Sequence, residues 1–287
     1  MSSDLPAARC LNCGKSLTGP FCSQCGQRVI PAYPTLRELI GDAWQELSGY
    51  DGRVVRTFRH LMWRPGALTL EVLEGHRARY VSPVRVYLVA SVMYFLIAAA
   101  SPNVMPQPRP PSRGGFNIDL RDPEAAAARL SPEKRAEILS SVERAPWWMR
   151  PVLRSAVLDP IDFKRRVMLN LPRVLFALVP VCAAILALFY RRRPFSQHLI
   201  FALHVHAVIF LTAAVGEAAD FTYSPVVVQT VGLLAFVFTV VYVLLALRTV
   251  YRERWRAIVL KSIGVTMIYA LACLIGLLGT LAWASVS

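Results

Sequence analysis

The amino-terminal segment carries four cysteines in two Cys-x-x-Cys-Gly knuckles: Cys10 and Cys13 before Gly14, and Cys22 and Cys25 before Gly26. Two such knuckles can bring four thiolates around one Zn²⁺ in a tetrahedron, and a metal shell filled by protein sulfur leaves no position for substrate or water. A glycine after each knuckle suits a sharp backbone turn, often with positive φ, whose N–H groups point at sulfur. The pattern predicts one structural, non-catalytic Zn²⁺ per chain.

A pair of disulfides is the alternative for these cysteines. The residues before Cys10 include Asp4, Pro6 and Arg9 but no apolar run typical of a secretory signal. We therefore expect this end to lie in the reducing cytoplasm, where paired Cys-x-x-Cys motifs favour metal. Residues 1–30 cannot bury a core of their own, and metal binding worth roughly 10–16 kcal/mol can supply the missing folding energy. We favour the zinc interpretation.

Three histidines lie close together in the sequence: His198 at the cytoplasmic edge of an apolar segment, and His204 and His206 within it. An unpaired imidazole in hydrocarbon is unfavourable by several kcal/mol, so the side chains of His204 and His206 must face protein or a hydrated cavity. Positions two residues apart on a regular helix differ by roughly 200° around its axis. His204 and His206 therefore cannot jointly bind one metal ion.

Two interpretations of these histidines stay open. In the first, they form hydrogen bonds between helices, with candidate partners on other segments: Tyr87, Ser91, Tyr94, Arg173, Gln229 and Thr266. In the second, His206 and Glu217, which differ by about 20° around a helix, form a proton path.

The elements that hold these residues are mostly membrane-length apolar segments. The chain has 287 residues, of which 55% are hydrophobic, and its mean hydropathy of +0.44 is too high for an ordinary soluble protein. Five segments approach or exceed the roughly 20 residues that cross a hydrocarbon core: 83–101, 171–190, 199–216, 225–247 and 262–284. We expect an all-α integral membrane protein with five transmembrane helices, a small N-terminal zinc ribbon and interfacial amphipathic helices.

The net charge of +14 first suggests nucleic acid as a partner. Residues 1–30, however, hold only Arg9, Lys15 and Arg28 against Asp4 and form no basic stripe. The strong basic clusters flank apolar segments, at residues 77–85, 191–193 and 248–261, which is the positive-inside pattern. We therefore expect membrane lipid, and not nucleic acid, as a partner.

The distribution of charge also predicts an orientation. The connection between the third and fourth apolar segments contains Glu217 and Asp220 and no Lys or Arg, so alternation places the amino terminus in the cytoplasm and the carboxyl terminus outside. The run Lys164-Arg165-Arg166 would then lie outside. It belongs to a long connection, and long translocated loops largely escape the charge rule.

Two amphipathic helices are predicted between the ribbon and the first span. The first starts at a capping box formed by Thr35 and Glu38, and the second runs from near Asp51 to just before Pro65. Arginines of the second helix can reach anionic lipid while Trp63 sits at headgroup depth. Alternatively, both helices pack on the cytoplasmic ends of the membrane bundle.

The long connection begins with a proline-rich linker at 102–115. Two later pairs, Asp122-Pro123 and Ser131-Pro132, each resemble an N-cap followed by proline at the first helical position, and they predict two short helices. The sequence contains no phosphate-binding loop, no Gly-x-Ser-x-Gly elbow and no His-Glu-x-x-His motif. We therefore lean toward a protein that is not an enzyme.

A set of residues follows the double ribbon in a familiar order: Tyr50-Asp51, Phe58, Pro65, Gly75, Arg77, Tyr80, Pro83 and Tyr87. Over about residues 10–95, the chain resembles the bacterial zinc-ribbon membrane family known as domain-of-unknown-function family 3667. A second block resembles the third span of that family: His198-Leu199, Phe201, Leu203-His204 and His206. The resemblance implies an architecture and a bacterial origin, and it carries over no catalytic residue.

The segment from Gly75 to Pro83 is where the chain enters the membrane. Gly75 can end a short helix, and Pro83 fits the first turn of the span. The side chains expected to contact lipid here are Arg77, Arg79, Tyr80 and Arg85. The alternative is a specific ligand pocket formed by Arg77, Tyr80 and Arg85.

We expect three parts: a cytoplasmic zinc ribbon at 1–30, amphipathic helices at 31–82, and a five-helix membrane domain at 83–287 with an extracytoplasmic loop at about 102–170. The leading hypothesis is a non-enzymatic, multi-pass protein of the bacterial inner membrane that displays the ribbon to a cytoplasmic protein partner or supports assembly. The alternative is a small transporter or proton-coupled membrane enzyme that uses the histidines of the third span.

Overall fold

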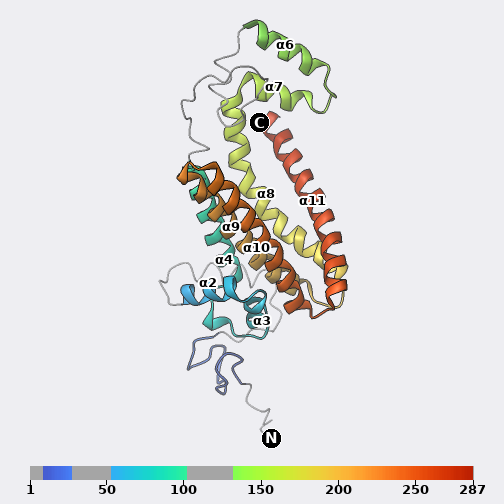
Figure 1. Cartoon of the computed structure of the whole chain (residues 1–287). Coiled ribbons are helices and arrows are strands. Elements are labelled where there is room, and N and C mark those ends of the chain that lie inside the picture. Colours follow the sequence, from blue (N-terminus) through green and yellow to red (C-terminus); the bar gives the residue numbers. More distant parts are fainter. Residues whose placement is uncertain (1–8, 28–52, 102–131, 287) are drawn as a thin grey trace.

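The computed structural model describes residues 9–27, 53–101 and 132–286 (Figure 1). Its elements are α2 (Arg53–Trp63), α3 (Ala67–Leu73), η1 (Arg77–Arg79), α4 (Pro83–Ala100), α6 (Pro132–Glu143), α7 (Arg150–Leu158), α8 (Pro160–Phe189), α9 (Phe195–Ala219), η2 (Asp220–Thr222), α10 (Pro225–Tyr251) and α11 (Trp255–Val286). Within the described residues, β pairing is limited to isolated bridges: one joins Arg9 and Ser16, and Phe21 takes part in another. The expected all-helical class is confirmed.

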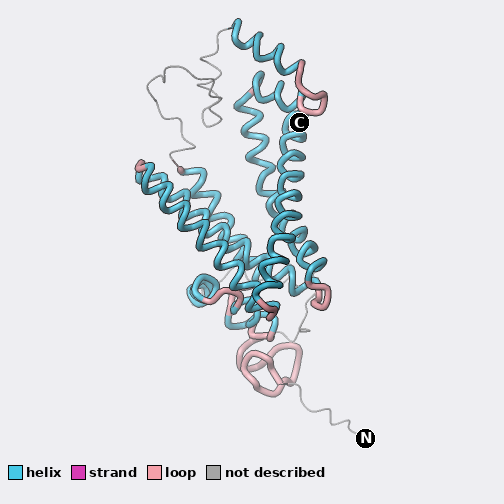
Figure 2. Tube along the Cα trace, turned by 45° about the vertical axis from the view of Figure 1, so that its right-hand side comes forward, coloured by secondary structure: helices cyan, strands magenta, loops and turns pink. Residues whose placement is uncertain are grey.

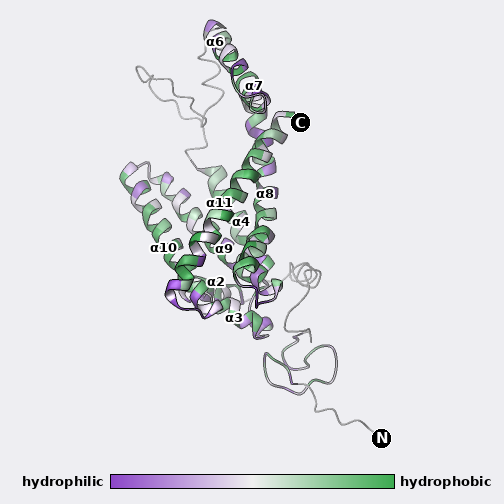
Figure 3. Ribbon diagram, turned by 90° about the vertical axis from the view of Figure 1, so that its right-hand side faces the viewer, coloured by the Kyte–Doolittle hydropathy of each residue, from purple (hydrophilic) through white to green (hydrophobic). Residues whose placement is uncertain are grey.

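Five helices, α4 and α8 to α11, are long and apolar enough to cross a membrane. Each covers one of the five predicted segments, except for the last residue of the first two, and the ribbon in Figure 3 shows that hydrophobic residues predominate along these helices. The second span differs from the prediction at its start, because α8 begins at Pro160 and not at residue 171. The basic run 164–166 therefore lies in the first turns of this helix, and α6 and α7 occupy part of the predicted loop.

The third span, α9, forms the centre of the bundle. It contacts α4, α8 and α10, and its buried residues lie on all sides of the helix, including Ile200, Ala202, Ala207 and Val208 at 0% exposure. A helix that is apolar all round is expected at the centre of a helical assembly. Figures 1 and 2 show α8 and α11 running side by side as a pair next to the group formed by α4, α9 and α10.

The predicted helix from near Asp51 is confirmed as α2. Its inner face packs on the bundle, because Leu61 belongs to the buried core and the Tyr242 hydroxyl of α10 donates to the Leu61 carbonyl oxygen at 2.5 Å. Its outer face leaves Val55 and Trp63 exposed by 73% and 82%. The helix predicted from Thr35, the linker at 102–115 and the helix predicted from Asp122 lie outside the described residues.

The sequence predicts that a short helix ends at Gly75, and α3 does end there, in a Schellman motif. The N–H of His76 donates to the Glu71 carbonyl at 2.9 Å, and the N–H of Gly75 donates to the Val72 carbonyl at 3.3 Å. Gly75 has a φ of +94°, which disfavours residues with a Cβ. Pro83 stands at the start of α4, so both ends of this connection behave as expected.

Candidate metal centre

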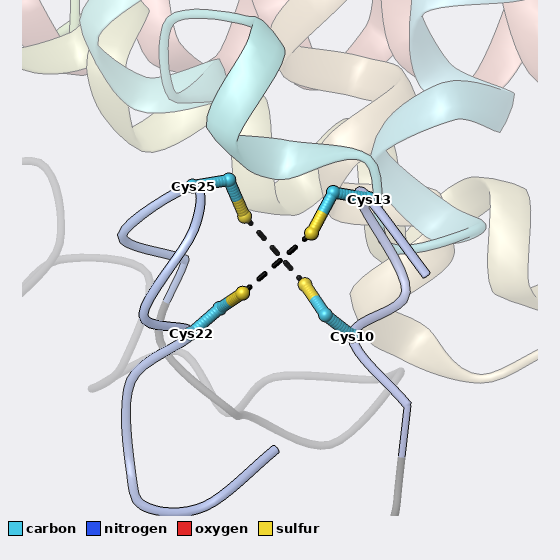
Figure 4. Close-up of side chains that lie close together, drawn as sticks. All are labelled: Cys10, Cys13, Cys22 and Cys25. Carbon is cyan, nitrogen blue, oxygen red and sulfur yellow. Dashed lines mark hydrogen bonds between the residues drawn. The ribbon is translucent and has the colours of Figure 1, made fainter. Parts of the chain in front are cut away.

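The four ribbon cysteines point toward a common centre (Figure 4). The Sγ atoms of Cys10 and Cys25 are 3.6 Å apart, as are those of Cys13 and Cys22, and all four lie within 4.8 Å of one another. Sulfur atoms bound to Zn²⁺ at about 2.3 Å form a tetrahedron whose edge is about 3.8 Å. A disulfide would require about 2.05 Å. The thiols therefore fit a single metal ion and are not disulfide-bonded.

The two knuckles have the same backbone geometry. In the first, the Gly14 N–H donates to the Cys10 carbonyl at 2.8 Å, and in the second, the Gly26 N–H donates to the Cys22 carbonyl at 2.9 Å. The two glycines have φ values of +77° and +69°. The prediction of left-handed glycines after each knuckle is confirmed, and the repeated turn explains why the cysteine pairs face each other.

Backbone N–H groups, burial and neighbouring thiols shift the pKa values of the cysteines in different directions. The N–H of Cys25 is the largest contributor that lowers the pKa of Cys22. Burial raises the pKa of Cys25, but hydrogen bonds, first that from the Gln27 N–H, outweigh it and hold the pKa at about 6. The Lys15 N–H favours the Cys13 thiolate, yet burial and the neighbouring cysteines raise its pKa to about 12. Thiolate stabilisation of this kind prepares the cluster for a divalent cation.

The ribbon is hydrogen-bonded to the turn that follows α3. The side-chain amide of Gln27 donates to the Gly75 carbonyl oxygen at 2.7 Å, and its Oε1 accepts from the Ala78 N–H at 3.0 Å. The guanidinium of Arg79 donates to the Asn12 carbonyl oxygen at 2.9 Å. These three bonds connect both knuckles to residues 75–79.

Gly75 also lies in direct contact with the ribbon. A Cβ placed on Gly75 would come within 2.7 Å of the Leu11 side chain. No ordinary side chain fits there without movement of Leu11. Gly75 thus serves both the Schellman turn and the ribbon contact, and only the first of these roles was predicted.

The residues expected to contact lipid have protein contacts in this structure. Arg79 bonds to the ribbon, and the Nε of Arg77 donates to the Val72 carbonyl at 3.4 Å. We expected the Tyr80 side chain to contact lipid, but it is 5% exposed and packs edge-on against His60. Arg85 follows Pro83 in the first turn of α4.

The three histidines of α9 are buried, with exposures of 0%, 3% and 8% for His198, His204 and His206. The Nδ1 of His198 shares a hydrogen bond of 2.7 Å with the Tyr251 hydroxyl of α10. The Nδ1 of His204 shares one of 2.9 Å with the Thr69 hydroxyl of α3. Each of these bonds connects α9 to another element.

The tautomer of His206 follows from its two bonds. Nδ1 lies 2.7 Å from the Ala202 carbonyl oxygen and must donate to it, so Nε2 accepts from the Tyr269 hydroxyl of α11 at 2.6 Å. The side chain is satisfied as a neutral imidazole. The hydrogen-bond partners of the three histidines are Thr69, Tyr251 and Tyr269. None of them belongs to the predicted set of partners at 87, 91, 94, 173, 229 and 266.

Glu217 does not join the histidine bonds within the described residues. Its side chain is half-buried near the end of α9, and Phe210 and Ala213 lie between it and His206 on the same helix face. Neither of these side chains can carry a proton. The predicted proton path therefore lacks polar side chains between His206 and Glu217 on this face of α9.

Sequence reasoning did not identify the residues that connect the parts of the molecule. These are Asn12 and Gln27 on the ribbon, Thr69 on α3, Tyr251 on α10 and Tyr269 on α11. The only local signal was the position of Gln27 directly after Gly26. Thr69, Tyr251 and Tyr269 lie in apolar segments, and nothing in the residue types around them marks them as hydrogen-bond partners.

Comparison with known proteins gives one match. No curated protein and no solved structure matches the chain. Residues 51–95 match the family model described as "Protein of unknown function (DUF3667)". The matched segment contains α2, α3, η1 and most of α4, and hence Gly75, Arg79 and Thr69. Over residues 51–95 the chain is thus similar to the DUF3667 family, whose function is unknown.

Proposed function

We propose that this protein is a non-enzymatic, multi-pass protein of the bacterial inner membrane whose cytoplasmic zinc ribbon recruits a protein partner. The observation that carries the proposal is the closed four-cysteine cluster, fixed to the turn at Gly75 by the Gln27 side chain. A metal bound by four sulfurs has no open position for substrate, which favours a structural role. A ribbon fixed to the membrane helices presents its free surface in a defined position.

Zinc is the metal that this ligand set favours. Four thiolates in a tetrahedral arrangement are typical of structural Zn²⁺, and iron held by the same four sulfurs is the alternative. The reducing environment expected for residues 1–30 keeps the thiols available. When bound, Zn²⁺ would supply the folding energy that this small segment lacks.

The free surface of the ribbon includes a large exposed aromatic side chain. Phe21, next to Cys22 in the second knuckle, is 58% exposed, while Asn12 and Gln27 are engaged with residues 75–79. Exposed aromatic residues are frequent anchors at protein interfaces. We propose Phe21 as the anchor for the partner.

The proposed orientation rests on charge. The turns at 191–193 and 252–254 and the helices α2 and α3 lie at the same end of the bundle as the ribbon (Figure 1). Basic residues concentrate at that end, and Glu217 and Asp220 lie at the other end. The positive-inside rule then favours a cytoplasmic ribbon and an outside carboxyl terminus.

The alternative, a small transporter or proton-coupled membrane enzyme, would use the histidines of α9. The neutral, doubly bonded state of His206 supports a structural role better than proton transfer. No separate observation favours transport, so we retain the ribbon-centred proposal.

Affinity purification of the full-length protein from native membranes tests partner recruitment. A specific partner should be recovered with the wild type and with Gln24→Ser, which changes an exposed residue of the same knuckle. Recovery should be lost with Cys22→Ser, which breaks the metal site, and with Phe21→Ser, which leaves all four cysteines intact. Equal recovery with all four proteins would contradict the proposal.

Elemental analysis of the same preparations tests the metal. We expect one Zn²⁺ per chain in the wild type, in Phe21→Ser and in Gln24→Ser, and a large loss in Cys22→Ser. Iron at similar stoichiometry would overturn the zinc assignment but leave the four-sulfur site in place.

A further inference from the structure

A pocket of about 530 Å³ lies where α10 ends and turns toward α11. It is lined by Leu245, Arg248, Thr249, Arg252 and Glu253. Under the proposed orientation, this turn faces the cytoplasmic leaflet, so the pocket lies at the depth of lipid headgroups. None of these residues belongs to the ribbon or to the histidine contacts of α9.

The pocket contains two arginines one helical turn apart. The guanidinium of Arg248 lies over the Trp255 ring at 4.6 Å, which holds it beside the pocket without neutralising its charge. Arg252, at the left-handed C-cap of α10, forms no side-chain ion pair within residues 9–27, 53–101 and 132–286. Both guanidinium groups are therefore available to an anion.

Among the described residues, the remaining polar groups of the pocket form no hydrogen bond or ion pair with these arginines. The Thr249 hydroxyl donates to the Leu245 carbonyl at 2.9 Å, so its single hydrogen is used within α10. Glu253 accepts from Lys261 at 2.6 Å through Oε1, while its Oε2 is buried and has no partner among the described residues. Two adjacent guanidinium groups match the several acceptor oxygens of a phosphate group.

An apolar surface continues from the pocket along α10. Leu245 lines the pocket and is 38% exposed, and Val241, one turn earlier on the same helix face, is 48% exposed. Trp255 is 41% exposed beside Arg248, as expected of an aromatic side chain at a membrane interface. A cationic pocket that opens onto an apolar helix face fits a molecule with a phosphate and an acyl chain.

We propose that Arg248 and Arg252 bind the phosphate group of an anionic membrane lipid whose acyl chain lies along Val241 and Leu245 of α10. The proposal rests on the orientation given above. Arg248 and Arg252 also oppose the partial negative charge at the carboxyl end of α10, as cations at helix ends commonly do. That role alone would stabilise the protein without selecting a lipid, and the two roles are therefore separable.

The test uses purified full-length protein in detergent and follows its thermal unfolding midpoint. The probes are short-chain phosphatidylglycerol, short-chain phosphatidylcholine and inorganic phosphate. The variant is Arg248→Gln with Arg252→Gln. The control is Arg254→Gln with Arg256→Gln, which removes the same charge from exposed residues that do not line the pocket among the residues described.

We expect phosphatidylglycerol to raise the unfolding midpoint of the wild type and of the control. The apparent affinity of the pocket variant should fall about tenfold or more, because two guanidinium–phosphate contacts are removed. An equal fall in variant and control, an equal response to phosphatidylcholine, or no response in the wild type would overturn the proposal. A response to inorganic phosphate that equals that to phosphatidylglycerol would assign the pocket to free phosphate and overturn the lipid.

If the double variant does not fold, Arg252→Gln alone is the variant and Arg254→Gln its control. The Arg252 side chain has no ion pair to lose among the described residues, so folding should be preserved. Its effect on phosphatidylglycerol binding is expected in the same direction. Unchanged binding in this folded variant would contradict the assignment of Arg252.

Discussion

The Gln27 side chain forms hydrogen bonds with the backbones of both Gly75 and Ala78. It donates to the Gly75 carbonyl and accepts from the Ala78 N–H, at 2.7 and 3.0 Å. Because Gly75 lies in the turn that ends α3, and Thr69 on α3 bonds to His204, one short helix and its closing turn connect the ribbon to the centre of the membrane bundle. The ribbon is thus seated on the membrane domain and is not a freely suspended module.

Replacing Gln27 with alanine should loosen the attachment of the ribbon to residues 75–79, where the Arg79–Asn12 bond remains, without loss of metal. The Ala78 amide loses its acceptor, so its hydrogen exchange should accelerate, and two lost hydrogen bonds correspond to about 1–3 kcal/mol of local stability. Hydrogen-exchange mass spectrometry of the segment around Ala78 measures this. Gln24→Ala, on the exposed side of the same knuckle, is the matched control and should leave exchange unchanged. Unaltered exchange in Gln27→Ala would show that the Gln27 contact does not seat the ribbon.

Gly75→Ala should destabilise the protein for two separable reasons. A Cβ at a φ of +94° is unfavourable by about 1–2 kcal/mol, and it would collide with Leu11 at 2.7 Å. In a double-mutant cycle, Leu11→Ala should relieve the collision and leave the backbone strain. Thermal unfolding of the four proteins gives the coupling energy. Strictly additive effects would mean that Leu11 does not approach Gly75 in solution.

The five spans were predictable because a membrane helix must bond its own backbone and cover it with apolar side chains. That requirement produces long local runs, such as 225–247 within α10. The start of α8 at Pro160 was missed because its first turns contain Asp162 and the basic run 164–166, which hydropathy excludes although the helix continues through them. Hydropathy identifies the part of a helix that lies in the hydrocarbon core, and it does not show how far the helix extends beyond that core.

The convergence of the four cysteines was predictable because their spacing reflects a local turn, with each cysteine pair closed by Gly14 or Gly26. The contact between the ribbon and the turn after α3 was not predictable, because Gln27 and Gly75 are separated by 48 positions and neither belongs to a periodic pattern. The same holds for Thr69 and His204, which are 135 positions apart. The burial of His204 was foreseeable from the cost of an unpaired imidazole in hydrocarbon, but its partner was not.

Reporter fusions test the orientation. The turns at Arg192 and Arg254 should score as cytoplasmic, because arginines beside membrane helices are retained on that side. Fusions at Pro111 and Ser287 should score outside. The measurement is paired alkaline phosphatase and green fluorescent protein activity, and a cytoplasmic score at Pro111 would contradict the five-span arrangement.

Thr69→Val should weaken the attachment of α3 to α9. Valine keeps the shape of threonine but removes the hydroxyl that pairs with the buried Nδ1 of His204. The expected loss is about 0.6–2 kcal/mol, the range for hydrogen bonds between helices in membranes. The matched control is Thr280→Val, since among the described residues the Thr280 hydroxyl bonds only to the Gly276 carbonyl of its own helix. Equal unfolding midpoints for the two variants in detergent would argue against a stabilising role for the Thr69 bond.

His206 separates the structural and proton-carrying interpretations of α9. Its Nδ1 donates to the Ala202 carbonyl and its Nε2 accepts from Tyr269, so a neutral side chain satisfies both contacts. Glutamine can retain a neutral hydrogen bond but cannot take up a proton near physiological pH. Leucine can neither form a hydrogen bond nor take up a proton. Tyr269→Phe removes the hydroxyl that bonds to Nε2 and leaves the imidazole in place.

We therefore expect His206→Gln to remain folded and to behave as the wild type in any cellular phenotype of a deletion strain. His206→Leu should unfold more easily by about 0.6–2 kcal/mol, and Tyr269→Phe should fall between the two because it leaves Nε2 unpaired in a buried position. Unfolding midpoints and abundance in membranes report the structural effect, and complementation of the deletion reports function. If His206→Gln is abundant and folded but fails to complement while Tyr269→Phe succeeds, the imidazole itself acts in proton transfer, and the purely structural role of α9 is wrong.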